Sequence, residues 1–213
     1  MVPSGVSFKF SGSYENQLRA EKRLGIVVPL VVVVIFLILY FQFRSVATAL
    51  MIFTAIALAF SGGFVMLWLY GQDWFMNFAI LDTHMRELFQ MRTFNLSVAV
   101  WVGFIALFGI ATDDGVVIAT YLKQSFEAHQ PTTVEGIREA VLEAGLKRVR
   151  PCLMTTATTL LALLPVLTSS GRGADIMIPM AIPAFGGMTI ALVTLFVVPV
   201  LFAAKAEFQV RKQ

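Results

Sequence analysis

The sequence predicts an all-α membrane protein with five transmembrane helices, and three observations carry this prediction. Hydrophobic residues make up 58% of the chain and charged residues only 14%, whereas soluble domains have about 45–50% and about 25%. Five stretches are apolar over the length of about 20 residues that a helix needs to cross a bilayer. None of them alternates with the period of two that strands show, so helices are expected.

Each predicted span follows from one long apolar run. The runs cover Leu24–Phe43, Val46–Tyr70, Leu96–Leu122, Pro151–Thr168 and Ile176–Ala204. The loops on the side of the C-terminus carry more Lys and Arg than the loops on the other side. The positive-inside rule therefore favours an arrangement with the N-terminus outside and the C-terminus in the cytoplasm.

The polar residues 1–23 are interpreted as the end of a domain outside the membrane, and residues 24–213 as the transmembrane domain. In "GVSFKFSG", Val6, Phe8 and Phe10 alternate with polar residues, which predicts a short strand. A single strand is not stable alone, so this N-terminal strand is a remnant of a larger sheet.

Two connections predict further helices. Residues 132–145 are expected to form a cytoplasmic amphipathic helix on the membrane surface, with Thr132 and Glu135 as a capping box and Gly145 as the stop. Its apolar stripe comprises Val134, Ile137, Val141, Leu142 and Leu146. Residues 72–94, rich in aromatic residues and methionine, predict an interfacial helix on the outer face.

Asp113 and Asp114 lie inside the third apolar run, between the uncharged residues 93–112 and 115–122. An ionised Asp near the bilayer centre costs about 2.5–3.5 kcal/mol on insertion scales, so such residues are functional by default. Burial and the adjacent like charge both oppose ionisation, and the pair binds and releases protons in coupled steps. A proton relay is the expected use, with Asp113 as the principal carrier and Asp114 tuning or orienting it.

Two other interpretations of the acidic pair stay open. The carboxylates could simply hydrogen-bond to hydroxyl groups, which Thr112, Thr155, Thr156, Thr158 and Thr159 could supply. An intramembrane aspartyl protease is disfavoured because adjacent residues of a helix point about 100° apart and do not share a face. Two acids that polarise one water would have to come from two helices.

Several blocks in fixed order resemble the resistance-nodulation-division (RND) transporters. They are "FIALFGIATDDGVVIATYL", "EAVLEAGLKRVRPCLMTTATTLLALLPVL" and "GADIMIPMAIPAFGGM". The likeness is greatest to the heavy-metal efflux branch, and within it to the copper and silver pumps. It covers almost the whole chain and implies the C-terminal transmembrane portion of a longer pump, preceded by the tail of a periplasmic portion.

The resemblance implies a transporter and not an enzyme. It implies proton-driven export of heavy-metal cations from the bacterial inner membrane by a homotrimer, without a cofactor. The implied partners are the N-terminal remainder of the pump, a periplasmic adaptor and an outer-membrane channel. A net charge of +3 that is spread along the chain suggests no nucleic-acid partner. The alternatives are an RND exporter of drugs or lipids and a non-transporting helper subunit.

The resemblance also implies roles for individual residues. The acidic relay residue of the family falls on Asp113, whereas Asp114 stands where the copper pumps carry an apolar residue. Cys152 occupies the position of a relay lysine. Met177 matches a methionine in the metal-passing chain of the copper pumps, and its thioether suits Cu(I) or Ag(I).

Overall fold

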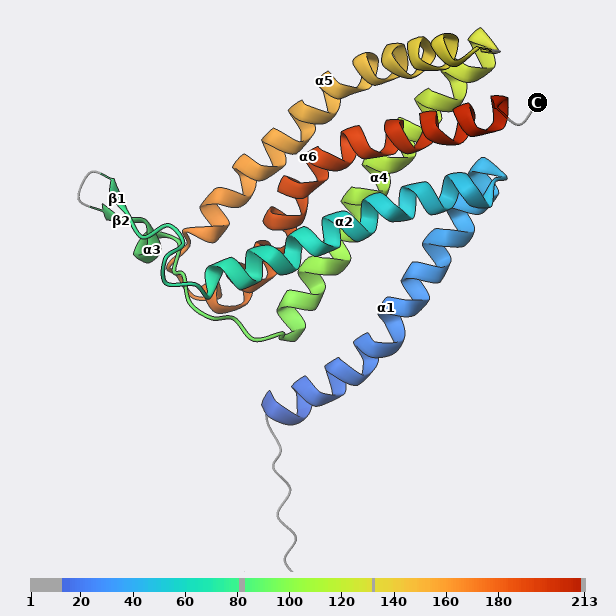
Figure 1. Ribbon diagram of the computed structural model, residues 1–213. Helices are drawn as coiled ribbons and strands as arrows, with labels where there is room; N and C mark the ends of the chain where they lie inside the picture. The colour runs from blue at the N-terminus through green and yellow to red at the C-terminus, as the bar shows by residue number, and fades with distance from the viewer. Residues whose placement is uncertain (1–12, 81–82, 132, 212–213) are drawn as a thin grey trace, which may run out of the picture.

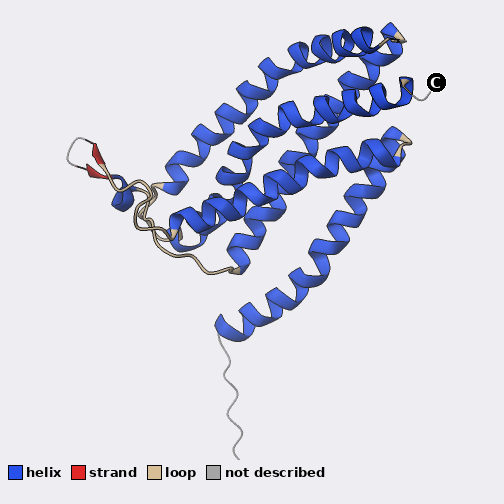
Figure 2. Ribbon diagram, in the orientation of Figure 1, coloured by secondary structure: helices blue, strands red, loops and turns tan. Residues whose placement is uncertain are grey.

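Five long helices form the structure, a computed structural model that describes residues 13–80, 83–131 and 133–211 (Figures 1 and 2). The helices are α1 (Ser13–Phe43), α2 (Val46–Tyr70), α4 (Val98–His129), α5 (Val134–Leu167) and α6 (Ala174–Val210), with a four-residue helix α3 (Met85–Leu88) between α2 and α4. The predicted strand at Val6, Phe8 and Phe10 lies outside the described residues, as does Thr132.

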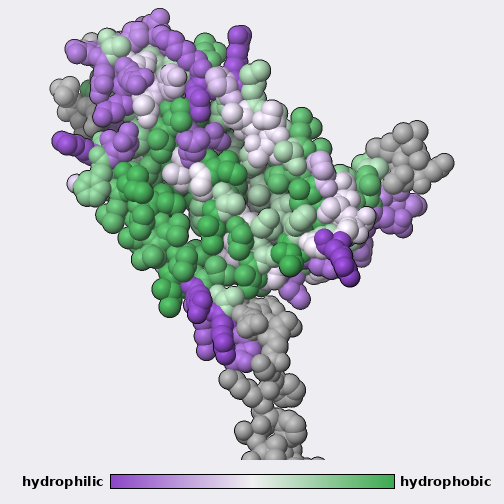
Figure 3. All heavy atoms as spheres, turned by 180° about the vertical axis from the view of Figure 1, so that it is seen from behind, coloured by the Kyte–Doolittle hydropathy of each residue, from purple (hydrophilic) through white to green (hydrophobic). Residues whose placement is uncertain are grey.

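Within the described residues, five helices are long and apolar enough to cross a bilayer, which confirms the predicted number of spans. Figure 3 shows the matching surface, a broad hydrophobic belt with hydrophilic residues gathered toward its ends. Exposed apolar side chains such as Ile26 (73%) and Phe41 (72%) stand on α1. Such a surface is stable against lipid rather than water, so the chain is membrane-embedded.

Short turns make neighbouring helices antiparallel. Between α1 and α2, Arg44 adopts a left-handed conformation with φ of 49°. The Ser45 hydroxyl then accepts a hydrogen bond from the backbone N–H of Thr48, which caps the first turn of α2. At the same end of the bundle, α4 stops at Gln130, also left-handed, and Thr133 caps α5 by accepting from the N–H of Gly136 at 3.2 Å.

Helix α4 lies centrally and contacts each of the other four long helices, while α1 contacts only α2 and α4 among the stronger helix pairs. Glycines allow the closest approaches. A Cβ on Gly103 would lie 2.1 Å from the carbonyl oxygen of Met180, and one on Gly186 would lie 2.7 Å from that of Gly62. Gly109 of the same helix differs, because no atom lies within 4 Å of the position that a Cβ would take there.

The separate surface helix ending at Gly145 is not seen, because α5 runs without a break from Val134 through Gly145 and Pro151 to Leu167. The expected single apolar stripe is split between two faces. Ile137 is buried (1% exposed), whereas Leu142 (65%) and Leu146 (72%) are exposed. The tertiary contacts of α5 therefore override the local stop signal of Gly145, which costs only about 1 kcal/mol relative to alanine.

The prediction of an interfacial helix over residues 72–94 is also wrong. The 72–94 loop forms a small hairpin with strands of two residues each. In it β1 (Ala79–Ile80) pairs antiparallel with β2 (Thr83–His84), and the short α3 follows. Its side chains bind it to the helix ends. The Gln90 amide donates to the carbonyl of Ser169 after α5, and Arg92 pairs with Asp175 of α6 at 2.9 Å.

Candidate functional site

The two aspartates of α4 lie in different surroundings. Asp113 is exposed on the surface of the bundle, and Asp114 is half-buried. Consecutive side chains diverge by about 100° around a helix, so one backbone position can present an acid outward and the next can present one to a neighbouring helix. The two carboxylates nevertheless interact electrostatically. The pair thus connects the outside of this bundle with its interior.

Asp114 is bound to helix α5 through Cys152. The thiol donates to the Asp114 carboxylate, with 3.2 Å between Sγ and Oδ1. Cys152 is fully buried and packs in an apolar cluster with residues of α2, α4 and α6, among them Ala55, Ile118 and Leu195. The hydroxyl of the buried Thr156, one turn further along α5, hydrogen-bonds to the same thiol. A line of polar groups therefore enters an otherwise apolar interface.

Arg148 supplies a positive charge on the same helix face as Cys152, one turn earlier. Its guanidinium interacts electrostatically with Asp114. Its Nε is buried and has no hydrogen-bond partner among the residues that the structure describes. The predicted surface helix at 132–145 and the predicted fourth span from Pro151 leave Arg148 in the connection between them, so its contact with Asp114 was not predicted. The i, i+4 spacing of Arg148 and Cys152 would have revealed it, given a continuous α5.

The threonines suggested as partners of the aspartates mostly bond within their own helices. The Thr112 hydroxyl donates to the carbonyl of Phe108 at 2.6 Å, and that of Thr155 to the carbonyl of Cys152 at 3.0 Å. Thr158 and Thr159 do the same. Thr156 is the exception, and it reaches Asp114 only through Cys152. Hydroxyl groups therefore do not explain the placement of two acids in this helix.

The geometry also weakens the protease interpretation. A protease dyad needs carboxylates from two helices that share one water, and the group facing Asp114 from α5 is a thiol. Among the described residues, no cluster of three His, Cys, Asp or Glu side chains could hold a metal ion either. The chemistry available at this site is proton binding and hydrogen bonding.

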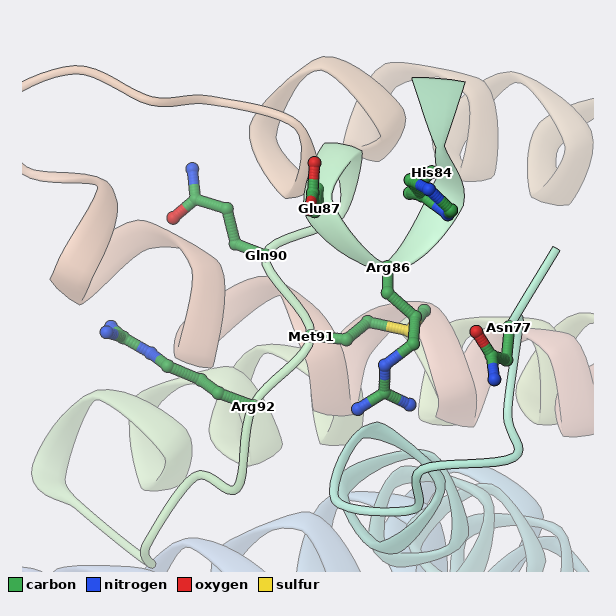
Figure 4. A pocket seen from close by; sticks show the side chains of 7 residues that line it. All are labelled: Asn77, His84, Arg86, Glu87, Gln90, Met91 and Arg92. Atoms are coloured by element: carbon green, nitrogen blue, oxygen red, sulfur yellow. The ribbon is translucent and has the colours of Figure 1, made fainter. Parts of the chain in front are cut away.

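Met177 lies in the first turns of α6, at the end of the bundle where the 72–94 loop packs, and its side chain is 41% exposed. The same end carries an open pocket of about 500 Å³ within the loop, lined by Asn77, His84, Arg86, Glu87, Gln90, Met91 and Arg92 (Figure 4). The structure does not bring Met177 into this pocket or near the aspartates.

Arg86 holds the loop in place. Its guanidinium donates to the carbonyls of Gln72 and Phe75 and pairs with Asp73 at 3.4 Å. The two arginines of the pocket wall are each paired with an aspartate, Arg86 with Asp73 and Arg92 with Asp175. The loop thus joins the ends of α2, α5 and α6 at this end of the bundle.

Solved structures resemble this arrangement of helices. A crystal structure of a heavy metal efflux pump superposes with a TM-score of 0.67 at 29% identity, and the match covers 94% of this chain and 18% of that one. The cobalt-zinc-cadmium resistance protein CzcA of Cupriavidus metallidurans is 29% identical over 202 residues.

Two further relatives are more similar in sequence. SilA of Salmonella typhimurium is 37% identical, and the cation efflux system protein CusA of Escherichia coli K12 is 36% identical, each over 205 residues. Both matches cover 93% of this chain but only 18% of the relative, so the chain spans under a fifth of their length. The sequence pattern of the AcrB/AcrD/AcrF family matches residues 1–80 and 88–206, and the chain belongs to this family.

Proposed function

We propose that this chain is the proton-coupling membrane portion of an efflux transporter that exports heavy-metal cations. The observation that carries the proposal is the Asp113–Asp114 pair, with one acid exposed and the other bonded to α5 through Cys152. Family membership and the similarity to a heavy metal efflux pump favour metal cations over drugs or lipids as the cargo. A non-transporting helper would have no need of ionisable groups at this depth.

The two acids carry out different steps of proton transfer. Asp113 faces away from this bundle and receives a proton from the part of the transporter that covers α4. Asp114 passes the proton on toward α5, where Arg148 stabilises its ionised form and Cys152 orients the carboxylate. A change in the charge of Asp114 alters its attraction to Arg148, and this couples proton transfer to movement of α5 relative to α4.

The experiment is proton flux in liposomes that contain the complete transporter and a pH-sensitive dye. Asp113→Asn and Asp114→Asn preserve shape but cannot titrate, so each should abolish metal-dependent proton flux without loss of folded protein. The sequence alone suggested a smaller effect for Asp114→Asn, and the contacts of Asp114 now lead us to expect a comparable one. Thr112→Val is the matched control, because its hydroxyl bonds only within α4. Unchanged flux in both asparagine variants would refute the relay.

Met177 is the proposed contact for the exported ion at the outer end of α6. An exposed thioether is a suitable ligand for a soft monovalent metal. Met177→Leu keeps size and apolarity but removes the sulfur, and it should lower copper or silver tolerance in cells at unchanged protein level. Met154→Leu, which alters an exposed methionine of α5, should leave tolerance unchanged. Equal tolerance in the two variants would assign Met177 to packing.

The proposed assembly follows the family resemblance. The chain would act in the bacterial inner membrane, together with the N-terminal remainder of the pump, as a homotrimer that meets a periplasmic adaptor and an outer-membrane channel. The exposed carboxylate of Asp113 supports this in part, because a charge on the apolar face of α4 needs a partner that covers it.

A further inference from the structure

Helices α4 and α5 form a continuous antiparallel seam that leads from Asp114 to the end of the bundle where α4 stops. At one point of the seam Asp114 meets Cys152. Three turns further along α4, the Ser125 hydroxyl donates to the carbonyl of Ala140 at 2.9 Å. The same pairing register therefore holds over this length, and the side chains between these points lie in one interface.

A pocket of about 250 Å³ opens along this seam, lined by six polar side chains from both helices: Tyr121, Gln124, Ser125 and His129 of α4 with Glu143 and Lys147 of α5. Tyr121 follows Asp114 by about two helical turns, or about 10 Å. Arg148 lies on α5 between the level of Asp114 and the level of Tyr121. The pocket has room for several waters, each of which occupies about 30 Å³ in the liquid.

The imidazole of His129 is arranged to take up a proton at one nitrogen. Nδ1 lies 3.0 Å from the backbone carbonyl of Ser125, which only accepts, so Nδ1 carries hydrogen. Nε2 lies 3.2 Å from a carboxylate oxygen of Glu143, so a proton bound at Nε2 is donated in a hydrogen bond to that carboxylate. Lys147 holds Glu143 at 2.6 Å. The ring is half exposed, so water reaches it.

We propose that this pocket is the route by which protons leave Asp114 for the cytoplasm, and that His129 is the group that holds each proton before release. The proposal rests on the proposed proton coupling. Protonated Asp114 gives its proton to water as the carboxylic O–H bond breaks. The proton passes along pocket water as hydronium to Nε2, where an N–H bond forms as a hydronium O–H bond breaks and water is left. Release to bulk water reverses this step. Glu143 balances the imidazolium charge, and Lys147 keeps Glu143 ionised and in place.

The charged groups near His129 support a role that depends on pH. From α5 these are Glu143 and Lys147. On α4 itself the Lys123–Glu127 pair precedes His129, with 3.9 Å between Nζ and Oε1. Histidine is the side chain that changes charge within roughly pH 5–8, the range in which cytoplasmic proton release takes place.

The test uses the complete transporter in liposomes, with the outer-face pH fixed and the cytoplasmic-face pH stepped through roughly 5–8. The unmodified protein should slow as the cytoplasmic face becomes acidic. His129→Gln should depend less steeply on cytoplasmic pH, because only the change in driving force remains, and its maximal rate should be lower by about a hundredfold, the lower end of what proton-transfer groups contribute. Glu143→Gln should lower the rate, because a proton held at His129 loses its counter-charge. His84→Gln, which changes the other histidine of the chain, is the control and should leave the profile unchanged.

A second readout separates proton transfer from a structural role. High concentrations of a small buffer such as imidazole at the cytoplasmic face should restore the rate of His129→Gln, because a mobile base replaces the missing ring. A wild-type profile in His129→Gln, or a loss that buffer does not restore, would overturn the exit route. If Asp114→Asn is inactive in the same assay, the proposed function survives that result. If Asp114→Asn transports normally, the proposed function itself falls.

Discussion

Helix α4 packs against α2 and α6 through close glycine contacts, whereas it packs against α5 through polar side chains. On the α2 and α6 side, glycine backbones meet their neighbours so closely that a Cβ on Gly115 would lie 2.8 Å from Ile52, and one on Gly103 would lie 2.1 Å from Met180. On the α5 side, contact is made by a thiol–carboxylate hydrogen bond, a serine hydroxyl bonded to a carbonyl, a histidine–carboxylate contact and a pocket.

This difference indicates which part of the bundle is rigid and which part moves. Where backbones are in direct contact, as at Gly103 and Met180, neither helix can rotate a side chain out of the way, so the contact cannot adjust. Polar side chains that meet across a hydrated pocket can exchange partners at small cost. Helices α2, α4 and α6 therefore form the rigid part of the bundle, which we call the frame. Helix α5 is the one whose position can respond to the charge of Asp114.

The largest effect expected is the loss of the frame in Gly103→Ala. The added Cβ would meet a backbone carbonyl that cannot move aside, so the cost should reach or exceed the upper end of the about 1–3 kcal/mol usual for overpacking. The yield of folded protein on size exclusion and its thermal midpoint in detergent should both fall.

Gly109→Ala is the matched control for that substitution, because nothing lies within 4 Å of a Cβ there. Alanine is favoured over glycine inside a helix by roughly 0.5–1 kcal/mol, so stability should be unchanged or slightly higher. Equal behaviour of the two variants would contradict the close contact between α4 and α6.

The next effect concerns Arg148 on the α5 side. Arg148→Gln removes the cation near Asp114, and proton-coupled transport in liposomes should fall by about a hundredfold, or about 2.7 kcal/mol. Folding should be preserved, because Arg148 as a whole residue is only half-buried and glutamine leaves no buried charge. Arg148→Lys should retain more activity than Arg148→Gln.

Arg150→Gln serves as the control for Arg148, since it removes an exposed charge two residues away. A comparable loss of transport in Arg150→Gln would mean that the basic segment acts through the membrane surface, not through Asp114. Transport by Arg148→Gln at the unmodified rate would remove Arg148 from the relay.

Different physical signals explain which features were predictable from the sequence. The spans followed from long apolar runs, because a bilayer imposes a minimum length on any helix that crosses it. The acidic pair could be recognised in the sequence because a charged side chain inside a transmembrane helix is costly in free energy. The path of α5 was missed because Gly145 and Pro151 resemble stop signals, and only packing against α4 and α6 keeps the helix continuous. The contacts of Asp114 with Cys152 and Arg148 depend on that path.

The smallest effect expected is at Cys152, and two substitutions separate its hydrogen bond from its packing. Cys152→Ser keeps a donor toward Asp114 and should change the transport rate by no more than about twofold, or about 0.4 kcal/mol. Cys152→Val fills the apolar cluster but offers no donor, and the carboxylate loses one hydrogen bond. A hydrogen bond to a charged group is worth about 1.5–3 kcal/mol, so a loss of about tenfold is expected. If valine transports as well as serine, the thiol only packs, and Arg148 alone would connect Asp114 to α5.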